Sequence, residues 1–279
     1  MEIKRLIVVA GAGSYPRLII RGAKSAGVAT VDVLAIKGST DWRTRRLADR
    51  VRPFGLGEIA AGVRWLAQER YDGVIFAGQV SPFSLFRTRF DAETRGWLAE
   101  LKSKNAHSIF GKLISEMEKS GVRLLPASLY MDGFLPGVGQ LTRRGLSAAE
   151  SADIAHAMKV AADMGVHDVG QTVMVKDGMV LAVEAFEGTN AAIRRGGRLG
   201  GPGAVVFKAA RRGHDMRFDI PVVGMKTMKR LRKSGATALG FQASRLILLD
   251  RDEVVAYADR HGIAIVGFDS GLPAAPLRP

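Results

Sequence analysis

The sequence predicts an α/β protein with two domains: a parallel-sheet N-terminal domain over residues 1–137 and a mixed α/β C-terminal domain over residues 138–279. A chain of 279 residues, 47% of them hydrophobic, is long enough for two domains of ordinary size. Strand and helix signals alternate through the first half, which implies right-handed crossovers and a parallel sheet. After Pro136 that alternation gives way to a long helix, a hairpin and several short strands.

In the first half, apolar and β-branched runs predict the strands, and helical spacing of apolar residues predicts the helices. The expected strands are 3–9, 30–36, 73–77 and 122–125, and the expected helices are 17–26, 58–70, 92–102 and 108–120. Ligands of a parallel sheet gather at the carboxyl ends of its strands. Here those ends are the loops at 11–16 and 78–82, so Gly11, Gly13, Ser14 and Gln79 are candidate binding residues.

The second half has two sharp local signals. Ser147 followed by Glu150 is a capping-box pattern that begins a long helix over 147–164. Two β-type runs flank Asp177-Gly178 and predict a hairpin over residues 171–185. Further short strands are expected at 204–208, 246–249 and 263–267, and helices near 225–233 and 252–261.

Composition excludes several functional classes. The chain has no Cys, which rules out disulfides, Cys-ligated zinc, iron–sulfur clusters and a thiol nucleophile. No apolar run reaches the roughly 18 residues needed to span a bilayer. The apolar N-terminus ends in a Gly-rich loop and is interpreted as a buried strand, not a signal peptide. The expected localisation is therefore cytoplasmic.

The formal net charge is +14, and the excess is concentrated. Residues 194–233 hold 12 Lys and Arg but only two acids, Asp215 and Asp219. Such a segment favours an anionic partner: a phosphorylated ligand, nucleic acid or an acidic membrane surface. A solvated basic face is the structural alternative. Aromatic residues are only 7% and do not interleave with these cations, so no specific nucleic-acid partner is expected.

The loop Gly11-Ala12-Gly13 follows the first strand and suggests phosphate binding. Glycines let backbone N–H groups approach an anion, and the following helix adds its dipole. The dinucleotide fingerprint needs a third Gly where this chain has Pro16, and Asp32 falls inside the second strand instead of at its end. A plain strand-to-helix turn is the alternative, and nicotinamide binding is disfavoured.

Two clusters could carry chemistry. Glu184, Glu187, Thr189, Arg194 and Arg195 lie within 12 residues around a Gly188-Thr189-Asn190 turn that can begin a helix. Carboxylates can bind a hard cation, and Arg can bind phosphate through two hydrogen bonds. The alternative is a capped helix beside an ordinary charged strand end.

The second cluster is the pair of acids within the basic segment. Asp215 and Asp219 should be ionised among so many cations, and they could hold Mg²⁺ or Mn²⁺ against an anionic substrate. Neutralisation of neighbouring Arg side chains is the alternative.

Beyond these clusters, the whole chain resembles the Caulobacter-type UDP-2,3-diacylglucosamine pyrophosphatase family of lipid A synthesis. The residues that carry the resemblance are 11–16, 76–80, 168–171, 181–189 and 217–221. It implies a Rossmann-like first domain, a second domain peculiar to the family, and a substrate held between them. The implied reaction is metal-assisted hydrolysis of the lipid-linked nucleotide sugar to UMP and 2,3-diacylglucosamine 1-phosphate.

The resemblance also implies site residues. The family's essential aspartate, in an Arg-x-Asp-x-Pro motif, corresponds to Asp219, with Glu184 and Glu187 as further catalytic carboxylates. The expected substrate contacts are Gly11, Gly13, Ser14, Gln79, Gln171, Thr189, Arg194, Arg195, Lys208 and Arg217. Because the substrate is a lipid, peripheral association with the inner membrane is expected, and a homodimer is left open.

The chain departs from the family pattern at three places. Asn190 stands where the family usually has Asp, Asn105-Ala106-His107 replaces Gly-Asp-Asp, and Ser14-Tyr15-Pro16 replaces a small-residue-Leu-Pro loop. Fewer carboxylates reduce the groups available for metal binding or proton transfer. The sequence therefore leaves a second hypothesis open: a paralogue that binds a nucleotide sugar without turnover.

Overall fold

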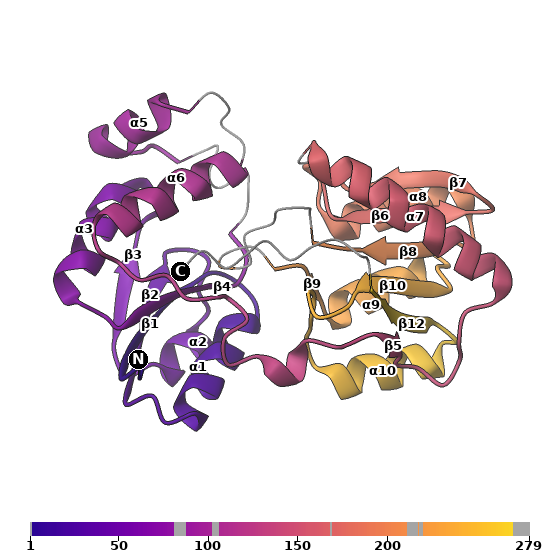
Figure 1. Ribbon diagram of the computed structural model, residues 1–279, viewed down its shortest axis with the longest axis horizontal. Helices are drawn as coiled ribbons and strands as arrows, with labels where there is room; N and C mark the ends of the chain where they lie inside the picture. Colours follow the sequence, from indigo (N-terminus) through magenta and orange to yellow (C-terminus); the bar gives the residue numbers. More distant parts are fainter. Residues whose placement is uncertain are drawn as a thin grey trace. The chain divides into compact units, whose positions relative to one another are not determined.

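The computed structural model describes residues 2–80, 88–101, 106–167, 169–210, 217 and 220–269. It divides into two compact units, each described by itself below. The N-terminal unit comprises the described residues up to Met131 together with Arg217, and the C-terminal unit comprises the others, from Asp132 onward. Figure 1 colours the chain along its sequence and labels the elements. No helix in the described part of the chain is both long and apolar enough to cross a membrane.

The N-terminal unit is built on a parallel sheet in the order β3-β2-β1-β4. Parallel strands in this order match the first four strands of the Rossmann arrangement, which confirms the predicted fold class. Its elements are β1 (Arg5–Ala10), α1 (Tyr15–Ser25), β2 (Thr30–Ile36), α2 (Trp42–Leu47), β3 (Val51–Phe54), η1 (Leu56–Glu58), α3 (Ile59–Glu69), β4 (Gly73–Ala77), α5 (Ala92–Ala99) and α6 (Ala106–Lys119).

Three elements of this unit differ from the sequence prediction. The expected strand at 122–125 makes only an isolated bridge, Val74 with Leu124, beside β4. The short strand β3 and the short helix α2 were not expected. The first three residues of β3 are exposed, and the strand contains Pro53, so it lacks the apolar run that marks a buried strand. Asp32 lies inside β2 as expected, where it is buried and accepts a hydrogen bond from the Tyr71 hydroxyl at 2.7 Å.

The C-terminal unit has a six-stranded mixed sheet in the order β5-β12-β10-β8-β6-β7, and Figure 1 shows these strands stacked in that order. A separate pair, β9 and β11, runs parallel. The elements are η2 (Asp132–Phe134), β5 (Gly139–Gln140), α7 (Ala148–Val166), β6 (Thr172–Lys176), β7 (Met179–Val183), α8 (Thr189–Gly200), β8 (Val205–Lys208), β9 (Val222–Val223), α9 (Met225–Lys233), β10 (Ala238–Gln242), β11 (Ile247–Leu248), α10 (Arg251–Arg260) and β12 (Ala264–Phe268).

Apolar side chains cover both faces of this sheet. On one face Ile154 and Ala157 of α7 pack with Val205 and Phe207. On the other face helices α8, α9 and α10 pack against alternate residues of the same strands, such as Val206. The alternation of buried residues along β8 follows from the two-residue period of a strand.

The hairpin predicted at Asp177-Gly178 is confirmed. Strands β6 and β7 pair in antiparallel orientation. Asp177 and Gly178, which form the turn between them, both have positive φ, at 51° and 76°. Two positive φ values are the signature of the tight hairpin turn that favours Asp-Gly. The carboxylate of Asp153, on α7, accepts hydrogen bonds from both turn N–H groups at 2.9 and 2.7 Å, so the hairpin tip is tied to the helix.

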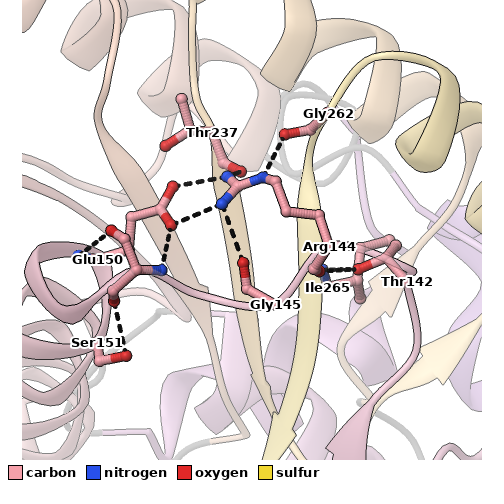
Figure 2. A network of polar contacts seen from close by, with 9 residues as sticks. Thr142, Arg144, Gly145, Glu150, Ser151, Thr237, Gly262 and Ile265 are labelled. Atoms are coloured by element: carbon pink, nitrogen blue, oxygen red, sulfur yellow. Dashed lines mark hydrogen bonds and ion pairs between the residues drawn. The ribbon is translucent and has the colours of Figure 1, made fainter.

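The capping box at the start of α7 is also confirmed, and it is part of a larger network (Figure 2). Arg144 donates to both carboxylate oxygens of Glu150, at 2.8 and 2.7 Å. The same guanidinium donates to the carbonyl oxygens of Thr237 at 2.7 Å and Gly262 at 2.8 Å. Because those carbonyls precede β10 and β12, the network fastens the start of α7 to the amino ends of these two strands.

Candidate active site

Four elements of the C-terminal unit bring polar side chains to one edge of its sheet. β8, β10 and β12 are parallel, so their carboxyl ends share an edge. β6 is antiparallel to β8 and therefore begins at that edge, and β7 ends there. β8 ends at Lys208 and β6 begins at Thr172. Glu184 directly follows β7, and Thr189 is the first residue of α8. Thr172 and Lys208 are direct partners in the ladder.

The side chains of Lys208, Thr189 and Glu184 form a connected chain. Lys208 Nζ lies 2.6 Å from Thr189 Oγ1, and Thr189 Oγ1 lies 2.9 Å from Glu184 Oε1. An ammonium can only donate, and a hydroxyl has one proton, so Thr189 accepts from Lys208 and donates to Glu184. The hydroxyl thus fixes the ammonium and the carboxylate relative to each other. Lys208 is only 6% exposed.

Several hydrogen-bonding atoms of this cluster remain available to a ligand. Glu184 Oε2 and Thr172 Oγ1 are both shut off from solvent and have no hydrogen-bond partner within the described structure. A lysine ammonium has three donors, of which Thr189 takes one. The first N–H groups of α8 have no partner inside the helix and carry its positive dipole end. The edge can therefore bind anionic oxygens and, through Glu184, a water molecule or a cation.

Gly170 and Gly188 shape the backbone around the cluster. A Cβ on Gly170 would lie 1.9 Å from the Glu184 carbonyl oxygen, so only glycine permits this close approach. Gly188, at φ 81°, precedes α8 and makes no side-chain cap. The predicted Gly188-Thr189-Asn190 turn does begin the helix, but the Thr189 hydroxyl contacts Lys208 and Glu184 instead of capping it.

Glu187 and Arg195 are bound to each other beside the cluster. Arg195 Nη2 donates to Glu187 Oε1 at 2.6 Å and to the Val183 carbonyl oxygen at 2.9 Å. Glu187 Oε2 accepts from the Ala185 N–H at 3.1 Å. The Arg195 hydrogen bond holds the pKa of Glu187 below its usual value. These contacts close the loop between β7 and α8, while Arg194 is exposed on the helix.

In the N-terminal unit the two loops that carry the predicted binding residues, after β1 and after β4, are in contact. Ala12 and Gln79 exchange backbone hydrogen bonds at 2.8 and 2.9 Å, joining the loop after β1 to the loop after β4. A Cβ on Gly11 would lie 2.5 Å from the Gln79 carbonyl oxygen, so Gly11 is needed for this contact. Gly13 has φ 100° and is exposed, and Ser14 immediately precedes α1 without capping it through its side chain.

The remaining predicted residues divide between the two units. The Gln171 carbonyl oxygen accepts from the Ala209 N–H at 3.0 Å, which places Gln171 beside Thr172 at the edge described above. Arg217 belongs to the N-terminal unit and pairs with Glu118 of α6 at 2.5 Å. Asp215 and Asp219 lie outside the described residues, as do Asp168 and Asn105. Within the described residues no group of three or more His, Asp or Glu side chains is placed to hold a metal ion.

Sequence reasoning missed Thr172, although it adjoins the predicted Gln171. The predicted hairpin was the one available signal for Thr172. The first residue of a strand lies at the same edge of the sheet as the last residue of an antiparallel neighbour. Pairing of β6 with β8, which are far apart in sequence, was needed to place Thr172 opposite Lys208.

Both halves of the chain match models of known protein-family domains. The family model of the LpxI N-terminal domain matches residues 5–134, and that of the LpxI C-terminal domain matches residues 137–266. The UDP-2,3-diacylglucosamine pyrophosphatase LpxI of Caulobacter vibrioides is 30% identical over 278 residues, covering 96% of this chain and 98% of that protein.

Two solved structures show a remote likeness to this chain. The biotin carboxylase domain of Hydrogenobacter thermophilus 2-oxoglutarate carboxylase is 16% identical, with 64% of this chain and 36% of that chain covered. The biotin carboxylase subunit of a pyruvate carboxylase is 12% identical, with 67% and 39% covered. The chain thus spans little more than a third of either protein, and both TM-scores are 0.28, too low to carry an argument. By the two family models and the full-length relative, this chain belongs to the LpxI family.

Proposed function

We propose that this protein hydrolyses the pyrophosphate of UDP-2,3-diacylglucosamine to UMP and 2,3-diacylglucosamine 1-phosphate in lipid A synthesis. The observation that carries the proposal is the 30% identity to the Caulobacter pyrophosphatase across almost the full length of both chains. The polar edge of the C-terminal unit supports it, because it combines a buried cation, a helix N-terminus and a carboxylate with an unpaired oxygen.

In this reaction the residues at the polar edge would stabilise charge on the phosphate and activate water. Negative charge increases on the scissile phosphate during hydrolysis, and preorganised donors stabilise it. Lys208 and the first N–H groups of α8 are such donors, and Thr189 holds Lys208 in place. Glu184 Oε2 has no partner within the described structure and can orient the attacking water or accept its proton. Asp219 is proposed as the essential carboxylate on the family motif alone.

A divalent metal, Mg²⁺ or Mn²⁺, is proposed as cofactor. The described residues offer one fitting donor, the buried and unpaired Glu184 Oε2, since hard cations prefer carboxylate oxygens. Asp215 and Asp219 would supply further oxygen ligands. When bound, the ion would neutralise charge on the diphosphate. The other carboxylate oxygen of Glu184, Oε1, accepts a hydrogen bond from the Thr189 hydroxyl. This hydrogen bond orients the carboxylate whether or not a metal is present.

We further propose that the protein works in the cytoplasm at the inner membrane surface. α8 and α9 pack together, and neither contains an acidic residue, whereas α9 alone carries Lys226, Lys229, Arg230, Arg232 and Lys233. Four of these five are exposed. A basic face of this kind is attracted to anionic lipid, where a diacylated substrate resides.

The second candidate function is binding without turnover. It is favoured by Asn190, the second residue of α8, which replaces an Asp usual in the family and leaves the helix start without that carboxylate. A phosphorus-detected assay separates the two functions. UDP-2,3-diacylglucosamine is incubated with the protein, with and without Mg²⁺ or Mn²⁺, and UMP formation is followed. Metal-dependent cleavage supports the hydrolase, and binding without cleavage supports the paralogue.

Substitution of Asp219 refines the assay. Asp219→Asn should fold, bind the lipid nucleotide and lose turnover by a factor on the order of 10² or more. Asp163→Asn, on the exposed side of α7, makes the same change of charge and serves as the control. A stable and fully active Asp219→Asn protein would remove Asp219 from the catalytic machinery.

A further inference from the structure

Arg245 lies at the same sheet edge as Lys208 and is held firmly there. It follows the last residue of β10 by three positions, and Phe241 of β10 is the ladder partner of Lys208. The backbone before Arg245 is fixed by hydrogen bonds from Ala243 N to the Phe268 oxygen and from Ser244 N to the Pro136 oxygen, both at 2.9 Å. After it, Leu246, Ile247 and Leu248 are fully buried.

Further contacts define the surroundings of Arg245. Ile247 N donates to the Pro221 carbonyl oxygen at 2.8 Å, so the segment runs beside the start of β9. Gln242 Oε1 accepts from Ala210 N at 3.1 Å, which ties the end of β10 to the chain just beyond Lys208. Ser244 adopts φ 58°, a left-handed conformation that is unfavourable for a non-glycine residue. The turn that delivers Arg245 is therefore held by its surroundings against a local preference.

The guanidinium of Arg245 is buried without compensation. The residue is only 9% exposed, and its Nη1 and Nη2 atoms have no hydrogen-bond partner anywhere in the described structure. Burial lowers the pKa of this group, but a guanidinium remains protonated at neutral pH. A buried charge without a partner opposes folding, and buried polar groups are nearly always paired. An unpaired and rigidly placed cation is therefore expected where a ligand supplies the counter-charge.

The shape of the group selects the ligand chemistry. A guanidinium presents paired N–H donors in a planar fork, which matches two oxygens of a phosphate. Lys208 and the start of α8 lie at the same edge and also favour anions. We propose that Arg245 is a phosphate-binding residue of this edge, contacting a phosphate oxygen of the substrate or of a product. The identity of that substrate rests on the proposed function, whereas the phosphate site does not.

The test uses the whole protein and two simple probes, inorganic pyrophosphate and UMP. Their affinities are measured by calorimetry for wild type, Arg245→Met and Arg245→Lys, and melting of each protein is followed without ligand. Arg245→Met should melt at the same temperature as wild type or higher, because an unpaired buried charge is removed. Its affinity for at least one probe should fall tenfold or more. Arg245→Lys, which keeps the charge but not the fork, should lose at least threefold.

Arg260→Met is the matched control, since Arg260 is exposed at the end of α10. It should leave both affinities unchanged. Arg245→Met that melts lower yet binds both probes within twofold of wild type would assign Arg245 a structural role and overturn the proposal. If Arg245→Met does not fold, Arg245→Lys with wild-type affinities would overturn it equally. A wild type that binds neither probe overturns it as well. A wild type that binds a probe through Arg245 but never cleaves UDP-2,3-diacylglucosamine rejects the proposed function and leaves the phosphate site standing.

Discussion

The Nζ atom of Lys208, at the end of β8, lies 2.6 Å from the Oγ1 atom of Thr189, at the start of α8. The contact joins a strand end to a helix N-terminus that precedes it by 19 residues, across the interior of the C-terminal unit. Two sources of positive potential, an ammonium and a helix dipole, thereby face the same space. Glu184, bound to the same hydroxyl, adds a carboxylate.

Replacing Lys208 removes the buried cation. Lys208→Met keeps much of the side-chain volume, so the protein should fold, but stabilisation of phosphate charge is lost. We expect kcat/KM for UDP-2,3-diacylglucosamine to fall by a factor on the order of 10². Lys159→Met on the exposed side of α7 is the control and should behave as wild type. Unaltered kinetics in Lys208→Met would show that this lysine has only a packing role.

Substitutions of Thr189 test whether its hydroxyl positions Lys208 and Glu184 or whether the side chain only fills space. Thr189→Val removes the hydroxyl that links Lys208 to Glu184 and leaves a side chain of similar shape. Turnover should fall, by on the order of tenfold, because both partners lose their common contact. Thr189→Ser restores the hydroxyl and should recover most of the activity. If serine and valine variants lose activity equally, the hydroxyl is not the feature that matters.

Gly170→Ala tests the close approach beneath Glu184. The added Cβ would meet the Glu184 carbonyl oxygen at 1.9 Å, and because that oxygen is a backbone atom, no side-chain rotation relieves the clash. We expect a loss of stability of about 1–3 kcal/mol together with reduced turnover. Gly96→Ala in α5, where a Cβ meets nothing within 4 Å, should be neutral or slightly stabilising. A Gly170→Ala protein as stable and active as wild type would contradict this geometry.

Acid should weaken the C-terminal unit through Glu150. Hydrogen bonds from Arg144, foremost, lower the pKa of Glu150 from its usual value of 4.5 to about 2. A carboxyl with a depressed folded-state pKa stabilises the fold above its unfolded-state pKa, and this contribution disappears as the pH falls from about 5 to about 2. Glu150→Gln should therefore reduce stability by on the order of 1–3 kcal/mol at pH 7 and by progressively less toward pH 2.

The readout for Glu150 must report on the correct unit. All three Trp residues, Trp42, Trp65 and Trp97, lie in the N-terminal unit, so tryptophan fluorescence is unsuitable. Hydrogen exchange of peptides from α7 and β10 in wild type and Glu150→Gln, at pH 7 and pH 3, measures the difference directly. Asp163→Asn is the control on the same helix. An equal deficit at both pH values would exclude linkage through this carboxyl.

Local signals in the sequence determined a large part of the fold. The Asp177-Gly178 turn needed only two residues that accept positive φ, and the capping box needed only Ser147 and Glu150 at the right spacing. β2, β4 and α9 were predicted with the bounds they have in the structure. In each case neighbouring residues carry the preference, so the sequence alone is sufficient.

Tertiary structure decided the rest of the fold and the composition of the site. β10, Ala238–Gln242, was not expected from its short sequence, yet it lies in the middle of the sheet and is fully buried. Residues 122–125 looked like a strand but make only one bridge. Thr172 meets Lys208 only because β6 and β8, which are far apart in the sequence, pair in a particular register. Arg245 Nη1 and Nη2 are buried without a hydrogen-bond partner in the described part of the chain, which no local pattern around Arg245 indicates. Such contacts depend on the ordering of strands far apart in the chain, and no local preference of the residues encodes them.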